Sequence, residues 1–457
     1  MIALKNLLSR APDRGPVDVV LAALAVALLG FGVVMVYSAS VIEATVVFRD
    51  SQYFLKRQGF YAIGALILIF GISRIDYRKL RPLTYPIIGG VTVMMILSVI
   101  GFGHSGGGAA RWLSLGPVHI QPSETAKLGL VLWLAYSLEK KRERVRSFSI
   151  GMLPHLLMSG FLMVLCLKQP DFGGASVLLL LTFTLLFVAG ARLGYLLGLA
   201  MLGSVFAIWA VRFTSYRWER MVAWFNMSEH RQDLAYQPFQ SVMSLGSGKL
   251  FGMGLGKGLQ VLYLPEAHTD FISAIIGEEL GFIGILVLCT VYLVIVARGV
   301  RTALSAEDEY GAYIAFGISV LFGVQALINL AVAMSVLPTK GLTLPFVSYG
   351  GSSLLVCAAA MGILLSISRK NGSGNARVAF MGGAFAGSTE ASAMLVTEAS
   401  FAPAVPSRTA PRAPDAPPRA SDVPPRASDV PPRAPSTPPG AKAKRKPRMP
   451  VVPEEAL

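Results

Sequence analysis

The stretch Leu262–Gly284 reads LYLPEAHTDFISAIIGEELGFIG and joins a polar segment directly to an apolar helical pattern. Its ionisable side chains are Glu266, His268, Asp270, Glu278 and Glu279. Acidic groups are costly inside an apolar, membrane-like segment, so each of these carboxylates is a functional candidate. What surrounds them in the rest of the chain decides which are structural and which take part in chemistry.

The composition indicates a membrane protein. Of 457 residues, 53% are hydrophobic and only 15% are charged, whereas a soluble domain carries about 25% charged residues. The apolar residues form blocks of about 17–25, the length that crosses a bilayer. The net charge of +15 fits basic cytoplasmic loops and a basic tail, so no nucleic-acid partner is expected.

Ten apolar segments are predicted to span the membrane, at residues 17–37, 54–72, 83–100, 122–138, 150–167, 172–190, 193–211, 271–297, 312–334 and 347–367. A cytoplasmic N-terminus places the basic loops 74–81 and 140–146 inside, as the positive-inside bias requires, and ten spans return the C-terminus to the cytoplasm. The predicted fold is an all-α polytopic membrane protein with ten transmembrane helices. A large extracytoplasmic loop, 212–270, lies between helices 7 and 8.

The chain changes character after the last span. Residues 369–457 are rich in Pro, Ala, Ser and Arg, and PPRASDV occurs at 417–423 and again at 424–430. Such a composition cannot bury a core, so we expect a disordered cytoplasmic tail beyond a membrane domain at 1–368. The three cysteines lie in apolar segments and show no metal or disulfide spacing.

Asp270 lies where the long outer segment meets the eighth span. A carboxylate at that position suits a general base acting on a hydroxyl at the membrane surface, or it caps the helix. On an extended strand Glu266, His268 and Asp270 would share one face and could hold a metal. No partner ligands at diagnostic spacing accompany them, so we assign no metal, and His268 is read as an orienting hydrogen-bond partner.

Glu278 and Glu279 lie about two turns deeper in the same helix. They suit either a proton relay or ion site, or a structural pairing with Lys or Arg from another span. We favour the structural pairing because intramembrane charges usually find partners.

Further polar pairs lie near other span ends. Glu124 and Lys127 are i,i+3 neighbours at the start of the fourth span; they form a local ion pair, or Lys127 faces the cavity and meets Asp270. Lys168 and Asp171 make a similar pair at the turn between spans five and six. Arg111 lies outside, where arginine suits either phosphate recognition or contact with lipid headgroups.

Two glycine-rich segments lie on the same side. Residues 246–258 (GSGKLFGMGLGKG) lack the GxxxxGK[ST] phosphate motif, so we expect a flexible loop that approaches a ligand or the membrane with bare backbone. Residues 341–353 (GLTLPFVSYGGSS) have the content of a broken or re-entrant helix, which is tolerated where it lines a cavity.

Four motifs together resemble the SEDS family (shape, elongation, division and sporulation) over about residues 17–368. They are RWLSLGPVHIQPSETAK at 111–127, QPDFG at 169–173, the long run from YQPF to EELG at 236–281, and LPTKGLTLPFVSYGGSSLL at 337–355. LPEAHTDF together with PTKGLTLP is closer to the division-type than to the elongation-type member.

The resemblance implies a peptidoglycan glycosyltransferase of the bacterial cytoplasmic membrane that polymerises lipid II and releases undecaprenyl pyrophosphate at the division septum. The family's essential aspartate falls on Asp270. Glu124 and Lys127 match cavity residues, as do Arg111, Lys168 and Asp171. Lys127, Arg111 or a divalent cation (Mg²⁺ or Mn²⁺) would neutralise the departing pyrophosphate.

The implied partners are a class B penicillin-binding transpeptidase, other divisome proteins and membrane lipid. Two other functions stay open at this point: a lipid II flippase, which would need no base at the outer edge, and a scaffold that only recruits the transpeptidase.

Overall fold

The computed structural model describes residues 15–102, 104–106, 109–115 and 118–369. The predicted tail, 369–457, lies outside this part of the chain except for its first residue. The helices are α2 (Val19–Phe48), α3 (Tyr53–Ser73), α4 (Thr84–Leu97), α5 (Pro122–Lys140), α6 (Leu153–Lys168), α7 (Phe172–Val188), α8 (Leu193–Arg212), α9 (Ser215–Phe225), α10 (Tyr236–Ser247), α11 (Ile272–Leu304), α12 (Glu309–Ala333) and α13 (Gly351–Ser368). Short turns of other helix types are η1 (Tyr77–Leu80), η2 (Ser98–Phe102), η3 (Arg142–Arg144), η4 (Phe148–Met152) and η5 (Gln260–Leu262).

Every segment predicted to span the membrane contains a helix. Seven stretches of the described chain are long and apolar enough to cross: Val19–Phe48, Tyr53–Ser73, Thr84–Gly101, Phe148–Lys168, Ile272–Leu304, Glu309–Ala333 and Gly351–Ser368. Two shorter helical stretches, Phe172–Val188 and Leu193–Val205, are also apolar. The chain is therefore a helical protein that crosses the membrane several times, and the count of ten stays a prediction.

Local sequence signals explain where several helices begin. Asp18 caps α2 by accepting the amides of Val20 and Leu21, and Asp308 caps α12 by accepting the amide of Gly311. Pro122 stands in the first turn of α5, where its missing N–H costs nothing. Asp18 also accepts the guanidinium of Arg298 at 2.9 Å, which ties the start of α2 to the last part of α11.

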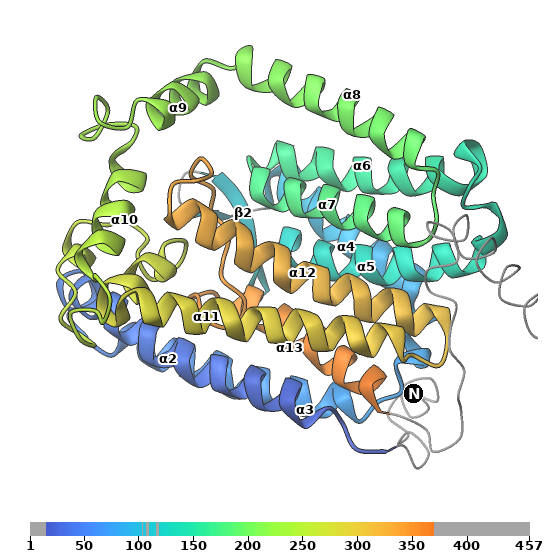
Figure 1. The fold of residues 1–457 in the computed structure, drawn as a ribbon, viewed down its shortest axis with the longest axis horizontal. Coiled ribbons are helices and arrows are strands. Elements are labelled where there is room, and N and C mark those ends of the chain that lie inside the picture. The colour runs from blue at the N-terminus through green and yellow to red at the C-terminus, as the bar shows by residue number, and fades with distance from the viewer. Residues whose placement is uncertain (1–14, 103, 107–108, 116–117, 370–457) are drawn as a thin grey trace, which may run out of the picture. The chain divides into compact units, whose positions relative to one another are not determined.

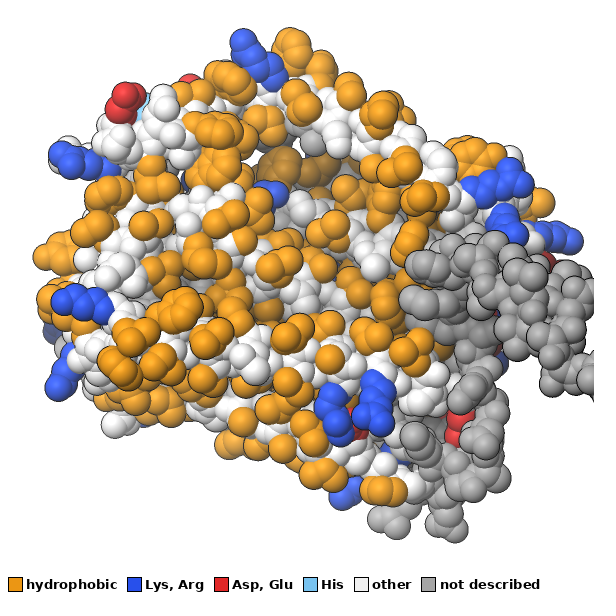
Figure 2. Space-filling model, viewed as in Figure 1, with side chains coloured by type: hydrophobic (Ala, Val, Ile, Leu, Met, Phe, Trp, Pro, Cys, Tyr) orange, Lys and Arg blue, Asp and Glu red, His pale blue; other side chains and the backbone are white. Residues whose placement is uncertain are grey.

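Helices α11, α12 and α13 lie at the centre of the helical unit, with α2 and α3 beside them (Figure 1). Close backbone approach fixes this packing, since a Cβ on Gly32 of α2 would lie 2.5 Å from the carbonyl oxygen of Phe346. Helix α8 runs along the edge, and most of its described side chains are exposed. Figure 2 shows mainly apolar side chains over α11 and α12, as a lipid-facing surface requires.

The segment between α4 and α5 corrects the expectation of an all-α fold. It forms a three-stranded antiparallel sheet in the order β1-β2-β3, with β1 at His104–Gly106, β2 at Ala109–Leu115 and β3 at Val118–Ile120. Leu113 of β2 pairs with Ile120 of β3. The alternation of apolar and polar residues in WLSL and VHI is the period-two signal that predicts strands.

The long segment between α8 and α11 is also more ordered than a loop, because it contains α9 and α10. Helix α10 packs against α11. Ser241 of α10 donates a hydrogen bond to the carbonyl of Ala333 at 2.7 Å, so the segment is attached to α12 as well.

Candidate active site

The residues before α11 form consecutive turns and not an extended strand. The carbonyl of Glu266 accepts the amides of Thr269 and Asp270 at 3.2 and 3.1 Å. As a result Glu266 is exposed, His268 is buried and Asp270 is half-buried. The strand-based metal reading of these three residues is therefore wrong, since they do not share a face. Among all described residues no group of three metal-type ligands occurs.

Asp270 lies against the segment that precedes α13. A Cβ built on Gly341 would be 2.8 Å from Oδ2 of Asp270, so a larger residue here would displace this carboxylate. Gly341 also touches α7, because a Cβ on Gly173 would lie 3.4 Å from its carbonyl oxygen. The short segment 340–342 therefore lies between Asp270 and the first turn of α7, and exposed Gly341 leaves the carboxylate near the surface.

Asn329 of α12 holds this arrangement together, and the sequence analysis missed it. Its amide nitrogen donates to the carbonyl of Asp270 at 2.9 Å and to that of Leu342 at 2.7 Å. Its oxygen accepts the hydroxyl of Ser273 at 2.8 Å. The signal in the sequence is an Asn inside an apolar span, because a buried polar group must find hydrogen-bond partners. In the structure Asn329 is 1% exposed.

His268 orients the turn through packing and backbone contact. Its ring lies 4.5 Å from that of Phe54 and 5.4 Å from that of Tyr349, measured between centroids. The amide of Tyr349 donates to its carbonyl at 2.9 Å. Burial lowers the pKa of His268, and the carboxylate of Glu43 stands 3.4 Å from Nδ1. The contacts are therefore mostly those of a neutral, packed ring.

Lys127 pairs with Glu124 and not with Asp270. Nζ of Lys127 donates to Oε1 of Glu124 at 2.6 Å, with the two side chains 1% and 7% exposed. The expected local ion pair is present, and the expected meeting of Lys127 with Asp270 is wrong. A salt bridge this deeply buried neutralises both partners, so Lys127 has little charge to spare for a ligand.

Asp171 and Lys168 occupy different environments and do not form the expected pair. Asp171 is buried and caps α7 by accepting the amide of Gly174 at 2.8 Å, whereas Lys168 is exposed at the end of α6. Asp171 interacts electrostatically with Cys166, as do Glu124 and Lys127, which places these three charges around one point. Arg111 lies on β2, and its side chain is outside the described part of the structure.

Glu278 and Glu279 bind a loop, contrary to the predicted pairing with Lys or Arg. Oε1 of Glu278 accepts the backbone amides of Leu259 and Gln260 at 2.7 and 3.0 Å. Oε1 of Glu279 accepts the hydroxyl of Ser38 at 2.6 Å. Both carboxylates are almost completely buried, and within the described residues neither forms an ion pair. In the part of the chain that the structure describes, amide and hydroxyl donors, and not a cation, bind these two carboxyl groups.

The glycine-rich loop lies against the backbone of α11. Helix α11 is broken at Gly281, with φ 70° and ψ −167°. The amides of Phe282 and Ile283 there donate to the carbonyls of Lys249 and Leu250. A Cβ on Gly252 would lie 2.1 Å from the carbonyl oxygen of Glu279, which explains why this segment needs glycine.

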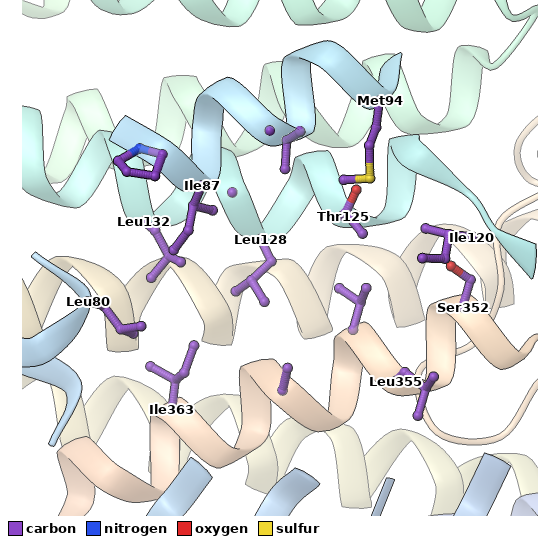
Figure 3. Close-up of a pocket in the computed structure, with 16 residues that line it drawn as sticks. Leu80, Ile87, Met94, Ile120, Thr125, Leu128, Leu132, Ser352, Leu355 and Ile363 are labelled. Carbon is purple, nitrogen blue, oxygen red and sulfur yellow. The ribbon is translucent and has the colours of Figure 1, made fainter. Parts of the chain in front are cut away.

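An apolar groove of about 520 Å³ lies between α4, α5 and α13 (Figure 3). Aliphatic side chains such as Ile87, Leu128 and Ile363 line its length. Thr125 and Ser352 lie toward one end, and Thr125 directly follows Glu124 in α5. The groove therefore reaches the same end of the helices as the buried ion pair.

The fold and the site together define a multi-span membrane protein with a half-buried carboxylate before α11, a buried ion pair at the start of α5, and an apolar groove between α4, α5 and α13. The chain belongs to the cell cycle protein family FTSW_RODA_SPOVE, whose family model matches residues 19–373. This family is the SEDS family that the motifs resemble.

Relatives and solved structures agree with this membership. The chain is 46% identical over 355 residues to a probable peptidoglycan glycosyltransferase FtsW of Geobacter metallireducens, covering 77% of this chain and 95% of the relative. It is 39% identical over 356 residues to stage V sporulation protein E of Bacillus subtilis, covering 77% and 97%. A chain from a structure described as "Structural coordination of polymerization and crosslinking by a peptidoglycan synthase complex" matches with a TM-score of 0.64 at 30% identity, covering 77% and 97%. The rod shape determining protein RodA of Thermus thermophilus matches with a TM-score of 0.58 at 32% identity, covering 77% and 96%.

Proposed function

We propose that this chain is a peptidoglycan glycosyltransferase that polymerises lipid II during septal wall synthesis, with Asp270 as its general base. The observation that carries the proposal is the placement of Asp270: its backbone carbonyl accepts the side-chain amide of Asn329, and its half-buried carboxylate lies against the exposed Gly341. Relatives named as peptidoglycan glycosyltransferases at 45–46% identity support the reaction class.

The chemistry is a displacement at the anomeric carbon of the donor sugar. The Asp270 carboxylate takes the proton of the acceptor hydroxyl while that oxygen forms a bond to the anomeric carbon. The bond between the anomeric carbon and the pyrophosphate oxygen breaks, and its electron pair leaves with the undecaprenyl pyrophosphate. A carboxylate near the surface suits this base role because a polar substrate can reach it.

The apolar groove lined by Ile87, Leu128 and Ile363 is the proposed seat of the lipid chain. Its walls are almost entirely aliphatic, so they can replace bilayer lipid around a prenyl chain. Its position between α4, α5 and α13 brings the pyrophosphate end of such a lipid toward Glu124, Lys127 and the segment that touches Asp270.

Ten membrane spans with both termini in the cytoplasm complete the proposal and place Asp270 on the extracytoplasmic side. The basic loops 74–81 and 140–146 support this orientation. A class B penicillin-binding transpeptidase is the proposed partner, supported by the match to a subunit of a peptidoglycan synthase complex.

Reconstitution tests this function directly. The purified full chain, with its transpeptidase partner, should convert lipid II into glycan polymer that muramidase digests. Asp270→Ala should abolish polymer, and Asp270→Glu should retain a fraction of it if the base role is correct. Polymerisation by Asp270→Ala at the wild-type rate would remove Asp270 from the reaction. Transport of lipid II without polymer by the wild-type protein would favour a flippase.

A further inference from the structure

Lys340 is a partly buried lysine on the segment between α12 and α13. No sequence pattern singled it out. Its Nζ donates to the hydroxyl of Ser176 on α7 at 3.3 Å. Within the described residues this neutral hydroxyl is its hydrogen-bond partner, and no carboxylate forms an ion pair with it. Lys340 therefore differs from Lys127, whose charge is matched by Glu124 at 2.6 Å.

The position of Lys340 relative to the base is set by its neighbours in the chain. Gly341, the next residue, touches the carboxylate of Asp270. The carbonyl of Leu342 is held by Asn329, and its amide donates to the carbonyl of Lys340 at 3.0 Å. This fixed turn has Asp270 on one side and the Lys340 ammonium, against α7, on the other.

An unmatched ammonium in this position has an energetic cost. Burial lowers the pKa of Lys340, because the charged form loses hydration without gaining a counter-ion. Charges with this kind of perturbation cluster at functional sites, where a ligand can supply the missing counter-charge. The proposed reaction generates the right ligand beside Asp270, since the departing pyrophosphate gains negative charge as its bond to the sugar breaks.

We propose that Lys340 binds the pyrophosphate of the lipid-linked donor and neutralises it as it departs. This inference rests on the proposed function, because it takes the ligand from that reaction. The ammonium acts as a charge and hydrogen-bond donor and transfers no proton, so the leaving group departs as the anion. Lys340 takes over the part that the sequence analysis gave to Lys127, whose charge is already matched.

A binding assay tests this role without requiring turnover. The full chain in nanodiscs of neutral lipid is titrated with geranylgeranyl pyrophosphate, and with geranylgeraniol as the uncharged comparison. Lys340→Met should weaken binding of the pyrophosphate about 10- to 100-fold, as expected for loss of a charged hydrogen bond, and leave binding of the alcohol unchanged. Lys340→Arg should restore most of the affinity, and Lys257→Met, at an exposed lysine, should match the wild type.

Three results would overturn the assignment. They are unchanged pyrophosphate binding by a folded Lys340→Met protein, failure of Lys340→Arg to restore it, and an equal loss of binding to phosphatidylglycerol added to the nanodiscs. The last result would show a site for phospholipid headgroups. Thermal unfolding of each variant confirms that it is folded.

Failure of the proposed function is measured separately, by polymerisation with the wild-type chain. If the wild type makes polymer while Lys340→Met binds and polymerises like it, only the Lys340 assignment fails. If the wild type makes no polymer from lipid II, the proposed function fails whatever the binding data show.

Discussion

Removal of the Glu278 carboxylate should release residues 259 and 260, which directly follow the glycine-rich loop, from α11. Glu278 is completely buried, and its Oε1 is the acceptor for the amides of Leu259 and Gln260. Ser244, which donates to its Oε2 at 3.0 Å, also contacts the carbonyl of Ala274 and keeps that partner. Glu278→Ala therefore leaves the two partly buried backbone amides of Leu259 and Gln260 without their acceptor.

The magnitude follows from those two donors. A hydrogen bond to a charged group contributes at least about 1.5 kcal/mol, so two contribute about 3 kcal/mol to the local opening free energy. That value corresponds to about a 100-fold faster exchange of the two amides in native-state conditions. Glu278→Gln keeps an oxygen at the same place and should accelerate exchange less than about tenfold.

Hydrogen exchange followed by mass spectrometry measures this effect on a peptide covering residues 253–262. A peptide from the buried part of α12 serves as the internal reference, because a global loss of stability would change both. Unchanged exchange at 253–262 in a folded Glu278→Ala protein would show that the Glu278 carboxylate does not hold the amides of Leu259 and Gln260. Equal acceleration in the Ala and Gln variants would show that the geometry of the carboxylate, and not its acceptor oxygens, holds the loop.

Four further predictions follow from other contacts. Asn329→Leu should destabilise the protein by about 2–4 kcal/mol, because two carbonyls and a hydroxyl lose their partner, and should lower polymer yield, whereas a full yield with intact stability would exclude it as a positioning residue. Lys127→Met and Glu124→Gln should each destabilise more than the double variant does, since each single change leaves a buried unpaired charge; additive unfolding free energies would contradict this. Burial lowers the pKa of His268 below 6.5, so the folded state binds fewer protons than the unfolded state and stability should fall as pH drops below about 6.5. His268→Phe should weaken this pH dependence of the thermal unfolding temperature. Equal pH dependence in both proteins would contradict the prediction. Deletion of residues 375–457 should leave polymerisation intact, because that composition cannot pack against the membrane domain, and a large loss would assign the tail a role in the reaction.

Several features could be predicted because they depend on local chemistry. Runs of apolar residues form helices in a membrane whatever their neighbours, since every backbone polar group must be satisfied within the segment. The i,i+3 spacing of Glu124 and Lys127 puts them on one face of any helix, and their ion pair follows. The strand β2 also has a local signal, the alternation in WLSL, although this segment was predicted to be a loop.

The apolar pattern and the motifs are enough to predict a helical membrane protein of this family with a carboxylate at the start of a long helix. Which charges are matched depends on the packing of the folded chain. Glu278 accepts the amides of Leu259 and Gln260, and Glu279 accepts the hydroxyl of Ser38, 241 residues earlier in the chain. Lys340 lacks a carboxylate partner, while Lys127 has one. Whether a buried charge is neutralised depends on groups far away in sequence, because Coulomb energy depends on distance in space and not on separation along the chain.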